Sequence, residues 1–188
     1  DLMRKAKARG VDATCETAPH YLVFSEEDVM DSGRFRMNPP IRTRADREAL
    51  IEGLRDGVID MVATDHAPHS MEEKSRGFAK SLNGIVGLET AFPALYTHLV
   101  LPGLLPLEKL LAAMCHAPRK RFNIPGGISP GDAADLAILD LQSERVIDPA
   151  EFYTMGRSTP FEGMKLRGEA VLTMVAGEVV WQKEGFTW

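Results

Sequence analysis

Apolar and polar residues alternate in blocks along residues 1–122, and these blocks predict strands and helices in turn. Residues 11–18, VDATCETA, have the composition of a buried strand. Residues 58–65, VIDMVATD, are apolar enough to be buried on both faces, as the strands of a parallel sheet are. Between them, residues 43–56 open with a capping-box sequence and place their apolar side chains on one helical face. This alternation predicts a βαβ architecture.

Three more helices follow from local signals. A cap residue and an acidic first turn predict a short helix at residues 25–32. Residues 89–100 form another helical pattern, and a proline opens a further helix at residues 106–118. The apolar residues of that last segment recur with the spacing of a helix packed on a core, at Leu107, Leu110, Leu111, Met114 and Cys115.

The pattern changes after residue 122, where glycines and prolines cluster in the segment NIPGGISPGD. Three strands are predicted beyond it, at residues 135–141, 164–177 and 178–182. The last two are expected to form a hairpin around residues 176–178. The sequence therefore predicts an α/β part at residues 1–122 and a mainly β part at residues 123–188.

Composition narrows the class of protein. The apolar fraction of 44% and the charged fraction of 26% are typical of globular proteins that are soluble in water. A net charge of −5 argues against a nucleic-acid-binding surface, and no apolar stretch is long enough to span a membrane. Cys15 and Cys115 have no ligand-like spacing, so we expect reduced thiols in a cytoplasmic protein.

The start of the chain suggests a longer protein. The sequence opens without an initiator methionine and inside a predicted helix. Its 188 residues are fewer than the roughly 250 of a complete eight-fold β/α barrel. We therefore expect the chain to be a fragment.

Candidate chemistry gathers at the ends of the predicted strands. Asp65 comes at the carboxyl end of a predicted parallel strand, where active sites of β/α folds collect, and Asn38, Arg42 and Glu16 follow other extended segments. On spacing alone, a turn-capping role for Asp65 is an equally good interpretation. His66 and His69 are separated by a proline, and each alone is more often a structural hydrogen-bonding residue than a ligand. These patterns indicate a polar site without identifying a reaction.

Five motifs along the chain indicate a protein family. In order, they are ETAPHYL, NPPIR, TDHAPH, GIVGLET and STPFEG. Their order and spacing resemble those of the dihydroorotases of the longer, bacterial-type class, within the amidohydrolase superfamily. The resemblance implies the fold class α/β, with a metal-dependent (β/α)8 TIM-like barrel and a small β-sandwich. Residues 1–122 would be the C-terminal part of the barrel, and residues 123–188 a C-terminal segment of the sandwich.

The resemblance also implies roles for individual residues. Asp65 matches the aspartate that ligates one of two zinc ions and acts as the general acid and base. His69 matches the histidine that contacts the substrate carboxylate, and Asn38 a substrate-binding asparagine. Asn83 and Gly84 match the point where backbone approaches the pyrimidine ring, although the family commonly has an aromatic residue where Asn83 stands. His66 has no family role, so we interpret it as structural.

Most of the family's metal ligands have no counterpart in this sequence. They include an HxH pair, a bridging carboxylate or carbamylated lysine, and two later histidines, and no HxH occurs in these 188 residues. A zinc site needs three or four protein ligands, and Asp65 supplies one. The isolated chain is therefore predicted to be inactive.

The resemblance favours an enzyme that reversibly hydrolyses the cyclic amide of dihydroorotate to N-carbamoyl-aspartate in pyrimidine biosynthesis. It implies a small-molecule substrate, and the family tends to form homodimers. A related cyclic amidohydrolase, such as a hydantoinase, dihydropyrimidinase or allantoinase, is the first alternative. The second is a non-catalytic dihydroorotase-like chain that assembles with aspartate transcarbamoylase.

Overall fold

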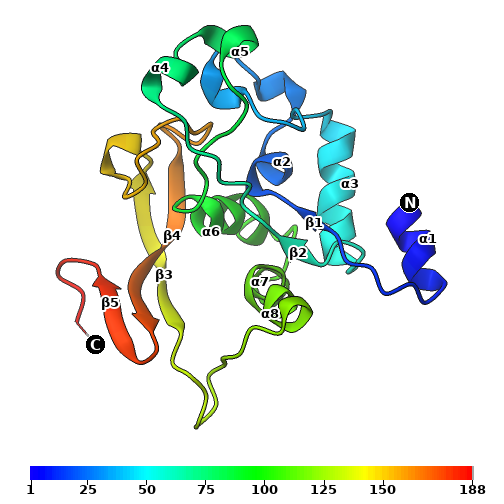
Figure 1. Ribbon diagram of the computed structural model, residues 1–188, viewed down its shortest axis with the longest axis vertical. Helices are drawn as coiled ribbons and strands as arrows, with labels where there is room; N and C mark the ends of the chain where they lie inside the picture. The colour runs from blue at the N-terminus through cyan, green and yellow to red at the C-terminus, as the bar shows by residue number, and fades with distance from the viewer. Residues whose placement is uncertain (188) are drawn as a thin grey trace.

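The computed structural model describes residues 1–187, which form a mixed α/β structure with two sheets (Figure 1). In the smaller sheet, β1 (Glu16–Thr17) and β2 (Met61–Val62) pair in parallel. The larger sheet is antiparallel with the order β3-β4-β5. Its strands are β3 (Leu136–Val146), β4 (Lys165–Val175) and β5 (Glu178–Gln182).

Short helices lie along the chain between the strands. The α-helices are α1 (Leu2–Ala8), α2 (Pro19–Val23), α3 (Arg44–Arg55), α4 (Met71–Lys74), α5 (Gly77–Lys80), α6 (Ala91–Leu95), α7 (Leu107–Leu111) and α8 (Ala117–Phe122). Single 3-10 turns occur at η1 (Glu26–Asp28), η2 (Gly33–Phe35) and η5 (Pro149–Glu151). The helix α6 continues into a π-helical turn, η3 (Tyr96–Val100), and α7 continues through η4 (Ala112–His116) into α8.

Two local predictions are confirmed. The Thr43 hydroxyl accepts a hydrogen bond from the Asp46 N–H at 3.2 Å while the Asp46 carboxylate accepts one from the Thr43 N–H, which completes the capping box of α3. The hairpin between β4 and β5 turns at Ala176 and Gly177, whose φ angles are 50° and 85°. Positive φ at both central residues is the geometry that suits a tight hairpin.

The strands of the first part are shorter than the sequence predicts. Of residues 11–18 only Glu16–Thr17 forms a strand, and of residues 58–65 only Met61–Val62 does. Beyond this ladder the two segments are joined through Asp60, whose carboxylate accepts from the Cys15 N–H at 2.9 Å. A strand needs a partner along its whole length, so β-favouring composition alone did not define the strand ends.

Two hydrophobic clusters form the core. One contains Leu22, Leu54, Leu95, Leu99 and Leu110, and packs α2, α3, α6 and α7 together. The other joins the two parts of the chain, because residues 23–41 and 85–94 share it with residues 147–166. Within it, the rings of Phe24 and Phe161 lie 5.1 Å apart between centroids. The parallel sheet, the α6 helix and the antiparallel sheet therefore lie next to one another (Figure 1).

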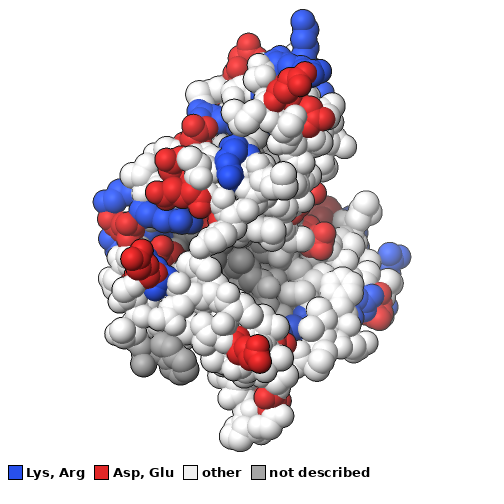
Figure 2. Space-filling view, turned by 60° about the vertical axis from the view of Figure 1, so that its left-hand side comes forward, with Lys and Arg blue, Asp and Glu red and all other residues white. Residues whose placement is uncertain are grey.

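The surface carries charges of both signs. On the face in Figure 2, acidic and basic side chains are interspersed, in keeping with the net charge of −5. Within residues 1–187, the helices are all too short or too polar to cross a lipid bilayer.

Candidate functional site

The parallel pair β1–β2 positions Asp65 at its carboxyl end. The residue follows β2 by three positions, and its side chain is exposed. Its backbone has a φ of 52°, in the left-handed region that non-glycine residues adopt infrequently. A residue kept in that region at a sheet edge is the kind of strained position that clusters at functional sites.

Tyr21 connects Asp65 to the segment that carries Asn38. The Tyr21 hydroxyl donates a hydrogen bond of 2.6 Å to the carbonyl oxygen of Pro39. Burial, and then the negative charge of Asp65, raise the pKa of Tyr21 to about 12. The phenol therefore stays protonated as a donor and lies within electrostatic reach of the carboxylate. Sequence analysis did not single out Tyr21.

Asn38 is exposed between two buried anchors. Met37 and Ile41 are 3% and 7% exposed, and both belong to the core cluster that contains Phe24. Upstream, Gly33 allows the chain to pass close to the end of α4, because an added Cβ would lie 2.1 Å from the Lys74 carbonyl oxygen. Packing on both sides thus fixes the backbone that presents the Asn38 amide.

His66 connects two loops. The Gly87 N–H donates to its Nδ1 at 3.2 Å, so the proton of a neutral ring is on Nε2, which lies 3.4 Å from the Thr154 hydroxyl. The backbone also forms an isolated parallel bridge between His66 and Ile85. Both ring nitrogens are engaged within the protein, as the structural interpretation of His66 requires.

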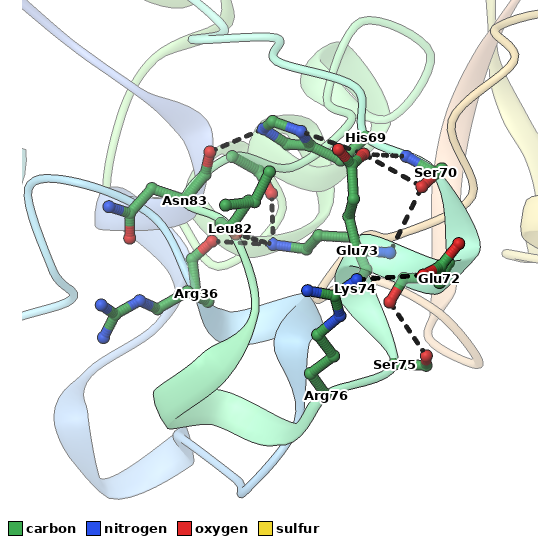
Figure 3. A network of polar contacts seen from close by, with 11 residues as sticks. Arg36, His69, Ser70, Glu72, Glu73, Lys74, Ser75, Arg76, Leu82 and Asn83 are labelled. Atoms are coloured by element: carbon green, nitrogen blue, oxygen red, sulfur yellow. Dashed lines mark hydrogen bonds and ion pairs between the residues drawn. The ribbon is translucent and has the colours of Figure 1, made fainter.

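His69 and Asn83 lie together, although fourteen positions separate them (Figure 3). The Nε2 atom of His69 is 2.8 Å from the Asn83 carbonyl oxygen. Gly84 has a φ of +134°, and an added Cβ would lie 2.7 Å from the Ala67 carbonyl oxygen and 3.0 Å from the His69 ring. Only a glycine lets the backbone of residues 83–85 approach the TDHAPH segment this closely.

The helix α4 begins immediately after His69. Ser70 caps it, accepting from the Glu73 N–H at 3.2 Å while the Glu73 carboxylate accepts from the Ser70 N–H at 2.9 Å. The hydrogen bonds that the Ser70 N–H and hydroxyl donate to the Glu73 carboxylate lower its pKa, and the His69 ring contributes a smaller effect. The His69 Nδ1 atom lies 3.6 Å from that carboxylate, so the cap of α4 also faces the histidine.

Lys74, the last residue of α4, was also missed by sequence analysis. It is only 6% exposed, although it lies in the strongly polar segment MEEKSR. Its Nζ atom donates to the carbonyl oxygens of Arg36 and Leu82 (Figure 3), and to that of Gly84. Nothing in the local sequence distinguishes this lysine from an exposed one, because its burial depends on segments far along the chain.

Some of the candidate residues are in direct contact, and others are connected only through intervening residues. His69 touches Asn83 and Gly84 directly. Asn38 is connected to this group through Arg36, whose carbonyl oxygen accepts from the Gly84 N–H at 2.9 Å. Asp65 is connected electrostatically to Tyr21. Two surface cavities, of about 490 and 440 Å³, are lined by other residues, the first between α3 and η3 and the second beside α6 and β4.

Asp65 has the chemistry of one metal ligand. Carboxylate oxygen is a common zinc donor, and the exposed side chain leaves the oxygens accessible. Within residues 1–187, histidine, cysteine, aspartate and glutamate side chains form no group of three that could hold a metal ion.

Comparison with known proteins identifies relatives over nearly the whole chain. The sequence profile of the amidohydrolase family matches residues 2–180. A dihydroorotase from Bacillus cytotoxicus is 49% identical over 185 residues, which are 97% of this chain and 43% of the relative. A dihydroorotase from Bacillus cereus is 48% identical with the same coverage. The chain thus spans less than half the length of these relatives.

Solved structures of hydantoinases have the same fold. The L-hydantoinase (dihydropyrimidinase) of Arthrobacter aurescens superposes with a TM-score of 0.88 at 36% identity, covering 100% of this chain and 43% of that one. The D-hydantoinase (dihydropyrimidinase) of a Thermus species gives 0.87 at 28% identity, again covering 100% and 43%.

Proposed function

This chain belongs to the amidohydrolase family, and we propose that it forms part of the active site of a dihydroorotase. The reaction is the reversible hydrolysis of the cyclic amide of dihydroorotate to N-carbamoyl-aspartate, a step of pyrimidine biosynthesis. The observation that carries the proposal is the 49% identity to a dihydroorotase over 97% of the chain. Since the chain spans 43% of that relative, the activity is proposed for the protein that contains these residues.

In the proposed fold, the two parts of the chain belong to two different domains. Residues 1–122 are the C-terminal part of a (β/α)8 barrel, which is consistent with the parallel pairing of β1 and β2 and the helix α3 between them. Residues 123–188 are a segment of a small β-sandwich, supported by the antiparallel order β3-β4-β5. The proposed site lies at the carboxyl end of the barrel strands, where such folds place their active sites.

Asp65 is proposed as the proton-transferring group. A cyclic amide nitrogen is a poor leaving group, so it must receive a proton as the ring opens. A carboxylate beside the reacting amide can take a proton from the attacking water and return it to that nitrogen. The exposed position of Asp65 after β2 makes its oxygens accessible to a substrate.

Asn38, His69 and the backbone of Asn83–Gly84 are proposed to bind the substrate. The His69 N–H donates to the Asn83 carbonyl oxygen in this structure. A substrate carboxylate can compete for that N–H, because hydrogen bonds to a charged acceptor are stronger than those to a neutral carbonyl. The Asn38 amide can donate to the same anion, and the backbone of the exposed residue Asn83 can pair with the ring amide.

Asp65 would hold one of two zinc ions, with the other ligands supplied from outside residues 1–187. When bound, zinc acts as a Lewis acid toward the ring carbonyl and makes hydroxide available near neutral pH. The 188 residues alone are expected neither to bind zinc tightly nor to turn over substrate, because one carboxylate is too few ligands.

A hydantoinase is the second candidate, favoured by the TM-score of 0.88 to the L-hydantoinase of Arthrobacter aurescens. Asn38 and His69 separate the two proposals, because these side chains suit a ring that carries a carboxylate. A homodimer is also proposed from the resemblance. If the protein hydrolyses no cyclic amide, the remaining proposal is a non-catalytic chain that assembles with aspartate transcarbamoylase.

The test is hydrolysis by the protein expressed from its complete reading frame with zinc present. We expect turnover of dihydroorotate and little turnover of hydantoin, dihydrouracil or allantoin, with activity lost in Asp65→Asn. Preferred hydrolysis of hydantoin or dihydrouracil would support the second candidate. Zinc-loaded, folded protein without activity on any of these rings would contradict both.

A further inference from the structure

Lys74 is a buried ammonium group whose hydrogen bonds all go to backbone carbonyl oxygens. Its Nζ atom lies 2.7 Å from the oxygen of Leu82, 2.7 Å from that of Gly84 and 3.1 Å from that of Arg36. An ammonium has three N–H donors, so these three acceptors use all of them. The side chain therefore has no donor left for a substrate, and its hydrogen bonds serve to tie backbone segments together.

The three carbonyl oxygens belong to segments that carry the proposed substrate-binding residues, and Figure 3 shows Arg36 and Leu82 beside the Lys74 ammonium. Leu82 and Gly84 flank Asn83, and Arg36 precedes Asn38 by two positions. Lys74 itself ends the short helix that starts after His69. One side chain thus connects the backbone near Asn38, the TDHAPH segment and the loop at residues 82–84.

Core packing anchors the segment of Asn38 through Met37 and Ile41, whereas the loop at residues 82–84 has exposed residues. Leu82 and Asn83 are exposed, as are half of the residues of α4 and α5. The carbonyl oxygens of Arg36 and Gly84 take part in the same group of hydrogen bonds, since the Gly84 N–H donates to Arg36 at 2.9 Å. Without the ammonium, the buried Gly84 carbonyl oxygen would lose the donor that Lys74 supplies, which is unfavourable, so its removal should release this loop.

We propose that Lys74 is a positioning residue, which holds Asn38, His69 and the Asn83–Gly84 backbone in the arrangement that receives the substrate. The inference rests on the proposed function of those residues. It assigns Lys74 no contact with the reacting atoms and no part in proton transfer. The expected signature is a loss of substrate affinity that exceeds the loss of catalytic rate.

The first arm of the test measures kinetics in the protein expressed from its complete reading frame. Lys74→Met keeps an unbranched apolar stem of nearly the same length but removes the three donors. We expect its KM for dihydroorotate to rise by at least tenfold while kcat changes by less than threefold. Lys80→Met is the matched control, because Lys80 is an exposed lysine at the end of α5 in the same loop. It should leave both constants unchanged.

The second arm measures hydrogen exchange without substrate. In Lys74→Met we expect the Gly84 amide to exchange at least tenfold faster than in the parent protein, with no change in Lys80→Met. If Lys74→Met does not fold, Lys74→Ala with added ethylammonium replaces it, and restored protection of Gly84 on addition of the amine supports the proposal.

The two arms separate the failure of one proposal from the failure of the other. Absence of dihydroorotate turnover in the parent protein contradicts the proposed function. In that case hydrogen exchange by itself tests whether Lys74 anchors the loop. An active parent whose Lys74→Met variant keeps its KM and its Gly84 protection overturns the role of Lys74. A variant that loses kcat and keeps KM overturns it as well.

Discussion

The Nε2 atom of His69 lies 2.8 Å from the carbonyl oxygen of Asn83. A carbonyl oxygen only accepts, so Nε2 carries a proton and donates it. The Nδ1 atom at the other side of the ring lies 3.6 Å from the Glu73 carboxylate. The ring is therefore oriented by the loop that follows it, and a substitution of His69 should disturb that loop together with the substrate.

Substitutions of His69 should separate these two effects. The side-chain nitrogen of Gln can replace Nε2 as a donor, whereas Leu has no donor. We expect His69→Gln to raise KM for dihydroorotate by about tenfold, which corresponds to about 1.4 kcal/mol, and His69→Leu to raise it considerably more. Steady-state kinetics measure both. Equal effects of the two variants would show that the N–H of His69 contributes nothing to binding.

Asp65 should be needed for activity. Its left-handed backbone conformation should also lower the free energy of unfolding. Its φ of 52° is disfavoured for a residue with a Cβ, so Asp65→Gly should raise the free energy of unfolding by about 1 kcal/mol. Asp65→Asn keeps the shape and tolerates the left-handed region, so its stability should match the parent. Both variants should lose roughly 10²–10⁴-fold in kcat, the usual contribution of a general acid and base.

Urea denaturation and turnover of dihydroorotate test this pair of variants. A stable, fully active Asp65→Asn protein would mean that the residue is only a turn former. An unchanged stability of Asp65→Gly would mean that the left-handed backbone is not strained.

Gly84 should tolerate no side chain. A methyl group would lie 2.7 Å from the Ala67 carbonyl oxygen and 3.0 Å from the His69 ring. We expect Gly84→Ala to lower the free energy of unfolding by about 2–3 kcal/mol, through the clash and the disfavoured φ together. Gly57→Ala is the control, because Gly57 has a positive φ of +75° but nothing within 4 Å of an added Cβ.

The two glycine variants are compared by their free energies of unfolding, from denaturation, and by their KM values for dihydroorotate. Gly57→Ala should show only the smaller backbone effect, of about 1 kcal/mol, with an unchanged KM. If both variants lose the same stability, the close approach of the loop to the TDHAPH segment is not what requires Gly84.

His20 should make the protein sensitive to acid. It is 1% exposed, and burial lowers its pKa from 6.5 to about 4. Between these pH values the unfolded chain binds more protons at this residue than the folded protein does, so the free energy of unfolding falls as the pH is lowered. The loss over the whole window is on the order of 3 kcal/mol.

His20→Leu tests this pH dependence. The His20 Nε2 atom has no hydrogen-bond partner among the described residues, so an apolar side chain should be accepted there. We expect a flatter dependence of the unfolding free energy on pH between 6.5 and 4. His98, whose pKa is also lowered by burial and by Arg47, accounts for part of the remaining slope. The exposed His116→Leu variant is the control, and a slope in His20→Leu equal to that of the parent would refute the assignment.

Much of the local structure could be predicted from the sequence. The capping box of Thr43 and Asp46 and the turn at Ala176–Gly177 depend on residues within four positions of one another, so local patterns encode them. The apolar stripe at residues 107–115 predicted a helix and one formed, although its second half is a π-helical turn. Asp65 was identified as the end of a parallel strand, but the strand itself is only Met61–Val62.

By itself, then, the sequence determined the helix α3 with its capping box, the hairpin of β4 and β5, and the motifs that identify the amidohydrolase family. Only the tertiary structure decided which charged side chains are buried and what they hold. Lys74 and Lys80 lie in the same polar loop, yet only Lys74 meets the carbonyl oxygens of Arg36 and Gly84. The physical reason is that a cation is buried only where distant backbone segments supply acceptors, and the spacing of neighbouring residues carries no record of those segments.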